Sequence, residues 1–152
     1  MIEHIWSMLC ARSIIEGSTG LLSLIDILEE VTLGELPPLE DNKEQIIRFP
    51  VSVVSLWQRK PESDPTKGTV RLSLISPHHE IIKEFEYDAD LTKEKQRLRT
   101  IARLDGIRFR GVGTYQFLVQ IRGEKETAWR EVATIPFPIK LGSPESPSSS
   151  PQ

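Results

Sequence analysis

The 152-residue sequence predicts an all-β fold, an antiparallel β-sandwich of about eight strands. Apolar and polar residues alternate with a period of two in short segments, and these segments are rich in β-branched and aromatic residues. Gly, Pro, Asn, Asp and Ser separate them at intervals of about 8–12 residues. We expect one sandwich domain over residues 1–141 and a disordered Ser/Pro-rich tail over residues 142–152, which holds no apolar residue to bury.

Two apolar segments, residues 2–16 and 21–33, flank the connection Gly-Ser-Thr-Gly at residues 17–20. Their apolar residues also fit helical stripes, so a pair of helices stays an alternative. The short connection and the abundance of Ile, Leu, Val and Trp favour a β-hairpin. We predict two paired strands whose apolar faces are buried against a larger sheet.

The following elements are separated by clear turns. Residues 34–45 are predicted as a loop, because Pro37 and Pro38 cannot extend a hydrogen-bonded ladder. Strands are predicted over residues 51–60, 69–76, 81–88, 97–104, 111–121 and 127–141. Pro136 and Pro138 remove two backbone donors from the last strand, so its final residues are expected at a sheet edge.

The strand over residues 111–121 carries the most specific fold signal. Tyr115, Phe117, Val119 and Ile121 alternate with polar or outward residues after two glycines. In sandwiches of the immunoglobulin type, a tyrosine near the start of a central strand donates a hydrogen bond to upstream backbone, two residues before a buried core residue. The spacing Tyr115-x-Phe117 predicts such a tyrosine corner, with phenylalanine in place of the cysteine of disulfide-bonded domains.

Three short motifs extend along the chain: Ile-Glu-His-Ile-Trp-x-x-Leu-Cys at residues 2–10, Leu-Ser-Leu-Ile-Asp at 22–26 and Gly-Thr-Tyr-Gln-Phe at 113–117. Through them, residues 2–141 resemble an uncharacterised bacterial family of small immunoglobulin-like β-sandwich proteins. The resemblance implies the fold and no agreed activity, and it supplies no catalytic residue.

Candidate thiol chemistry would need Cys10 and His4. Six residues along a strand separate two side chains by roughly 20 Å, far beyond hydrogen-bond reach. A buried, inert thiol is therefore expected, and a single cysteine leaves no internal disulfide.

Candidate metal ligands are equally sparse. Consecutive residues diverge in a turn, so His78-His79-Glu80 is interpreted as a solvated hairpin tip and not as a zinc site. The loop acids lack the dense alternation of a calcium loop; they are Asp64, Asp88 and Asp90. No phosphate-binding loop and no Gly-x-Ser-x-Gly elbow is present. We expect no metal, no cofactor and no enzymatic activity.

Charge is the most informative polar feature. Residues 93–110 hold seven basic residues against two acidic ones, and residues 26–44 hold seven acidic residues against one lysine. One interpretation is a docking stripe that binds an acidic protein surface or another copy of the chain; its residues are Arg97, Arg99, Arg103, Arg108 and Arg110. The alternative, which we favour, is an ionic ladder in which Glu84 and Glu86 face Arg97 and Arg99 across a hairpin.

These observations predict a non-enzymatic protein-interaction or accessory module. A structural component of a phage-like or self-assembling complex is the alternative. A net charge of −3 gives no reason to expect nucleic-acid binding, and no apolar run is long enough to span a membrane. The N-terminus lacks the basic region of a signal peptide, so a cytoplasmic location is expected. The partner is expected to be a protein, or a second copy of the chain.

Overall fold

The computed structural model describes residues 1–40, 43–62, 64–92 and 94–142, and its elements are all strands. Their bounds are β1 Glu3–Ile15, β2 Leu22–Ile27, β3 Val31–Leu33, β4 Ile46–Ile47, β5 Val51–Gln58, β6 Thr66–Ile75, β7 Ile81–Leu91, β8 Arg97–Leu104, β9 Ile107–Arg108, β10 Gly113–Gly123 and β11 Arg130–Leu141. The predicted disordered tail falls almost wholly on residues 143–152, which lie outside the described residues.

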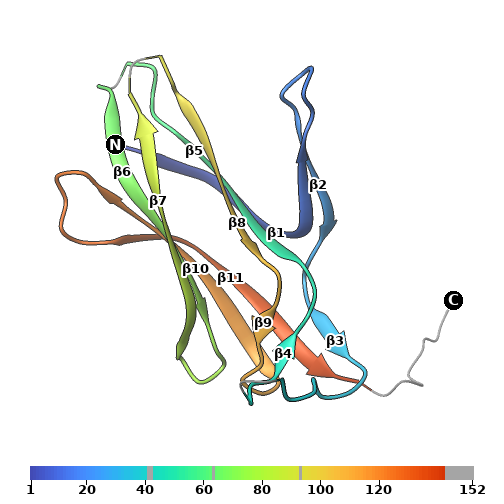
Figure 1. The fold of residues 1–152 in the computed structure, drawn as a ribbon. Helices are drawn as coiled ribbons and strands as arrows, with labels where there is room; N and C mark the ends of the chain where they lie inside the picture. The colour runs from blue at the N-terminus through green and yellow to red at the C-terminus, as the bar shows by residue number, and fades with distance from the viewer. Residues whose placement is uncertain (41–42, 63, 93, 143–152) are drawn as a thin grey trace, which may run out of the picture.

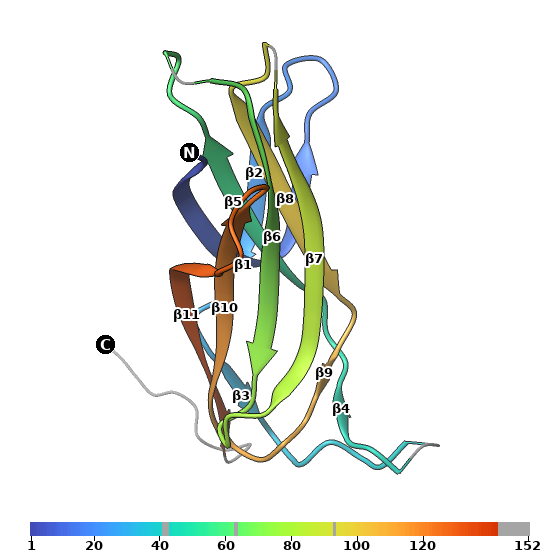
Figure 2. The same ribbon diagram turned by 90° about the vertical axis from the view of Figure 1, so that its left-hand side faces the viewer.

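Two large sheets face each other and form the sandwich (Figures 1 and 2). One has the strand order β2-β1-β5-β8 and the other the order β3-β11-β10-β6-β7, while β4 and β9 form a small separate pair. The predicted all-β sandwich is confirmed. Its strands outnumber the eight that we expected because β3, β4 and β9 have only two or three residues each, too few to give a period-2 signal. One pair, β3 with β11, is parallel.

The core lies between the two sheets. Trp57 of β5 and Tyr115, Phe117 and Phe137 of β10 and β11 are fully buried. The rings of Phe117 and Phe137 lie 6.0 Å apart, in a tilted arrangement that aromatic pairs prefer. The alternation that predicted the strand over 111–121 therefore marks the side of β10 that faces the other sheet.

The predicted tyrosine corner is present. The Tyr115 hydroxyl donates a hydrogen bond to the Gly111 carbonyl at 2.8 Å and accepts one from the Arg110 amide at 2.7 Å. Gly111 has a φ of 93°, a conformation that residues with a Cβ rarely adopt. The ring thus ties the connection before β10 to the start of that strand, and burial raises the pKa of Tyr115.

The prediction of a strand hairpin at the N-terminus is confirmed, and the helical alternative is wrong. The second predicted strand, over residues 21–33, is however divided, because the hairpin ends with β2 and residues 31–33 form β3 in the opposite sheet. β1 and β2 form an antiparallel hairpin whose turn lies at residues 16–21, closed by a hydrogen bond from the Glu16 amide to the Leu21 carbonyl. Burial of both apolar faces, however, is only partly realised. Of the twelve large hydrophobic residues that are exposed among those described, six lie on this hairpin: Ile5, Met8, Ile14, Ile15, Leu21 and Ile27.

The last strand differs from the prediction at its very end. Residues 139–141 of β11 pair with β3 on one side, although we expected them at an edge. Pro136 and Pro138 precede this segment, and their stretch of β11 pairs with β10 alone among the described strands. The prolines therefore lie on an open edge of the sheet. Pairing with β3 begins at residue 139, after the last residue that lacks a backbone N–H.

No helix in the described part of the chain is long and apolar enough to cross a membrane.

Candidate functional site

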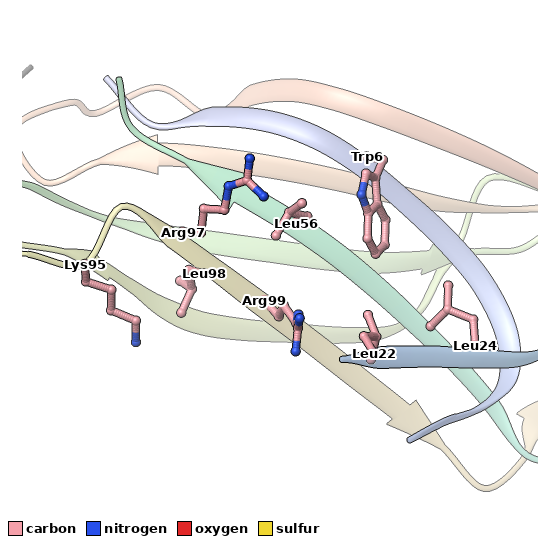
Figure 3. Close-up of a pocket in the computed structure, with 8 residues that line it drawn as sticks. All are labelled: Trp6, Leu22, Leu24, Leu56, Lys95, Arg97, Leu98 and Arg99. Carbon is pink, nitrogen blue, oxygen red and sulfur yellow. The ribbon is translucent and has the colours of Figure 1, made fainter. Parts of the chain in front are cut away.

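A cleft of about 680 Å³ lies on the outer side of the sheet β2-β1-β5-β8. Figure 3 shows the residues that line it. Its apolar residues are Trp6, Leu22, Leu24, Leu56 and Leu98, and its cationic residues are Lys95, Arg97 and Arg99. An aromatic ring among leucines, bordered by positive charges, makes this cleft the strongest candidate for a binding site.

The cleft exists because β1 changes partner halfway along its length. Up to Cys10 the strand pairs with β5, and from Cys10 onward it pairs with β2. β1 bends sharply along its length, and the end of the β1–β2 hairpin that carries its turn projects away from the rest of the sheet (Figure 1). The long side chain of Arg99 on β8 connects the two, because its Nη2 donates a hydrogen bond of 3.2 Å to the Gly20 carbonyl in the turn of the hairpin. The hairpin therefore forms one wall of the cleft.

The floor of the cleft is one row of residues across three strands. Trp6 of β1 is paired in register with Leu56 of β5, and Leu56 is paired with Arg99 of β8. Directly opposite residues in neighbouring strands point to the same side, so an indole, an isobutyl group and a guanidinium lie next to one another. Leu22 and Leu24 of β2 complete the apolar wall below the indole (Figure 3).

The electrostatics of the cleft are one-sided. Lys95, Arg97 and Arg99 are exposed, and no acidic residue is among the described residues that line the cleft. Within the described part of the chain, no ion pair involves Arg97 or Arg99. Their positive charges are therefore open to a negatively charged partner.

The predicted ionic ladder is wrong. Glu84 and Glu86 lie on β7 and pair across to β6, whereas Arg97 and Arg99 lie on β8 in the opposite sheet. Glu84 instead accepts a hydrogen bond from the Ser73 hydroxyl at 3.0 Å. The prediction failed because the connection between β7 and β8 crosses from one sheet to the other and does not close a hairpin.

The docking stripe is divided by the fold. Arg108 and Arg110 form ion pairs of 3.4 and 3.5 Å with Glu44, and Arg110 also lies 3.9 Å from Glu80. The second half of the stripe is thus neutralised by the acidic segment of the same chain. Two residues from these charged segments, Lys93 and Asp41, lie outside the described residues.

Arg103 occupies a separate position on β8. Like Arg97 and Arg99 it is exposed and points outward, as the alternation predicted. It borders a smaller hollow of about 300 Å³ between β8 and β7. Burial raises the pKa of Tyr87 on β7, and the positive charge of Arg103 reduces this increase. Of the five predicted arginines, only Arg97 and Arg99 line the large cleft.

His4 has a partner that the sequence did not reveal. His4 Nε2 lies 2.7 Å from Ser7 Oγ, and Ser7 Oγ lies 2.6 Å from Ser55 Oγ. A register shift after His4 places residues 4 and 7 on the same side of β1, where strict alternation would separate them. Burial lowers the pKa of His4, which favours the neutral ring. The hydrogen bonds satisfy hydroxyl groups that the sheet partly or fully buries.

Cys10 is fully buried, and burial raises the pKa of its thiol. A protonated, inaccessible thiol is a poor nucleophile, as expected from the sequence.

The His78-His79-Glu80 motif forms a turn, whereas Asp88 and Asp90, which we predicted in a loop, lie on β7. His79 has a φ of 68° in the tight connection between β6 and β7, and the Ser76 hydroxyl accepts hydrogen bonds from the amides of His78 and Glu80. Asp90 accepts two hydrogen bonds from Thr92, which lower the pKa of its carboxyl. Within the described ranges, no three His, Cys, Asp or Glu residues are grouped so that they could hold a metal ion.

No family model matches the chain, and no curated protein matches it either. The resemblance to a bacterial family stays a prediction.

Proposed function

We propose that this chain is a non-enzymatic protein-interaction module that binds a segment of a partner protein in the cleft between the β1–β2 hairpin and β8. The observation that carries the proposal is that exposed Arg97 and Arg99 line the same cleft as Trp6 and Leu56. Trp6, Leu56 and Arg99 lie in one row across three strands. The cytoplasmic location, and the absence of nucleic-acid and membrane partners, stay predictions from the sequence.

The composition of the cleft indicates which segments fit. Large apolar side chains of a partner would bury against Trp6 and the leucines, and tryptophan is among the residues that contribute most to binding energy at interfaces. Carboxylates on the same segment would pair with Arg97 and Arg99, giving the arginines the counter-charges that they lack among the described residues. We expect partner segments that combine large apolar residues with Asp or Glu.

Panning a library of displayed random peptides against the immobilised full chain tests the function. We expect enrichment of peptides in which Asp or Glu flanks a large apolar residue. The enriched peptides should lose binding to an Arg97→Glu/Arg99→Glu variant, because charge reversal in the cleft repels their carboxylates. Arg103→Glu is the matched control, since Arg103 lies on the same outward side of β8 and does not line the cleft.

Two results would overturn the proposal. One is the absence of any enriched sequence above background. The other is enrichment of peptides that bind the wild type and the double arginine variant equally well, which would place the binding surface elsewhere.

A further inference from the structure

The end of the molecule far from the cleft exposes a second unusual surface. Leu36 and Leu39, in the segment between β3 and β4, are 54% and 69% exposed, and Glu35, which precedes Leu36 in the sequence, is exposed as well. Leu39 is the second most exposed of the large hydrophobic residues described, after Met1. We call Glu35, Leu36 and Leu39 the acidic leucine patch.

The backbone around this patch is held in place. Gln45 Nε2 donates a hydrogen bond of 2.7 Å to the Pro37 carbonyl, and Leu39 forms a bridge with Gln45. Arg48 pairs with Glu40 at 2.6 Å at the end of the patch. Because these contacts fix the segment, docking it on another surface would cost little conformational entropy.

The patch and the cleft are complementary. The patch offers two exposed leucines and an exposed carboxylate on one short segment, and the cleft offers leucines and Trp6 next to Arg97 and Arg99. The hairpin lies toward one end of the sandwich, whereas the segment between β3 and β4 lies at the other (Figures 1 and 2). The patch therefore cannot reach the cleft of its own chain, but it can reach the cleft of another copy.

We propose that the cleft of one copy binds the acidic leucine patch of a second copy, so that the chain associates head to tail. This inference rests on the proposed function, because it names the occupant of the same cleft. Two different surfaces meet in such a contact, so the copy whose cleft is filled keeps a free patch, and the copy whose patch is bound keeps a free cleft. Heterologous contacts of this kind build open filaments, or rings where the rotation closes.

Sedimentation velocity with purified full-length protein over a range of concentrations, up to ~1 mM, tests the association. We expect species larger than a dimer to grow with concentration and to shrink when salt is added, because screening weakens the pairing of Glu35 with the arginines. A Leu36→Ser/Leu39→Ser variant and an Arg97→Glu/Arg99→Glu variant should each be monomeric.

Mixing the two variants gives the decisive result. The leucine variant keeps an intact cleft and the arginine variant keeps an intact patch, so one contact between them remains possible. An equimolar mixture should form a heterodimer and nothing larger. Ile81→Ser and Arg103→Glu are the controls, because Ile81 is 61% exposed on β7 and Arg103 lies outside the cleft; both should associate as the wild type does.

The outcomes separate the two proposals. A wild type that is monomeric at every concentration, or a mixture that gives no heterodimer although both variants keep the circular dichroism spectrum of the wild type, overturns head-to-tail association. If acidic peptides from the displayed library still bind the cleft in that case, the interaction module stands with another occupant. If the library also yields nothing, the cleft is not a binding site.

Discussion

Tyr115→Phe tests the corner that closes the core. The substitution keeps the buried ring and removes only the hydroxyl, which makes two backbone hydrogen bonds, to Arg110 and Gly111. The phenylalanine variant leaves one amide and one carbonyl without these partners in a partly buried site. Each buried group that loses its partner costs about 1–3 kcal/mol, and water that reaches the site reduces the cost. We expect a total loss of about 1–3 kcal/mol.

Urea unfolding at neutral pH measures this loss. A domain of this size typically has an unfolding free energy of about 5–15 kcal/mol and a urea dependence of about 1–3 kcal/mol per molar. The midpoint should therefore fall by about 1 M, with the urea dependence unchanged. Tyr115→Ala should lose more, about 3–5 kcal/mol, because it also leaves a cavity between the sheets.

Tyr87→Phe is the matched control. Tyr87 is partly buried on β7, and its hydroxyl makes no hydrogen bond within the described ranges. This variant should stay within about 0.5 kcal/mol of the wild type. Equal effects of the two substitutions would show that the Tyr115 hydroxyl contributes nothing specific, and the corner would not explain how the segment before β10 is held.

Three further predictions follow from the same structure. Changing Arg97, Arg99 and Arg103 together to Gln should leave the melting temperature within a few degrees of the wild type, because these arginines form no ionic ladder with the glutamates of β7. A fall as large as that of Tyr115→Phe would contradict this. Burial raises the pKa of Tyr115 above its ordinary value of about 10, so its contribution to stability is complete below that pH and is lost as the pH rises further. The unfolding free energy of the wild type should therefore fall more steeply above pH 10 than that of Tyr115→Phe, measured by urea titration at several pH values. Deleting residues 143–152 should leave the melting temperature unchanged, because the segment has no apolar residue to bury.

The core could be predicted from the sequence because it depends on local alternation. Tyr115 and Phe117 follow the period of two, and their spacing also predicted the hydrogen bond to upstream backbone. The outward position of the arginines on β8 followed from the same rule. These properties need only the direction of each side chain relative to its own strand.

The pairing of strands could not be predicted in the same way. Alternation shows which side of a strand faces the core, but not which strand lies beside it. Glu84 and Arg97 are close in sequence, and only the crossing of the chain between sheets separates them. The contact between His4 and Ser7 was missed for a related reason, since one register shift reverses the sides of all the residues that follow it.

The cleft follows from a property that neither alternation nor composition reveals, the length of β1. The strand has thirteen residues, and only those up to Cys10 pair with β5. The remaining residues form a hairpin that extends past the sheet and leaves Ile14 and Ile15 half exposed. An extension of this kind adds little to the core, and its exposed apolar residues favour aggregation unless another surface covers them. The hairpin is therefore better explained by the cleft that it forms with Arg99 than by the stability of the sandwich, and this is why the search for a partner should begin there.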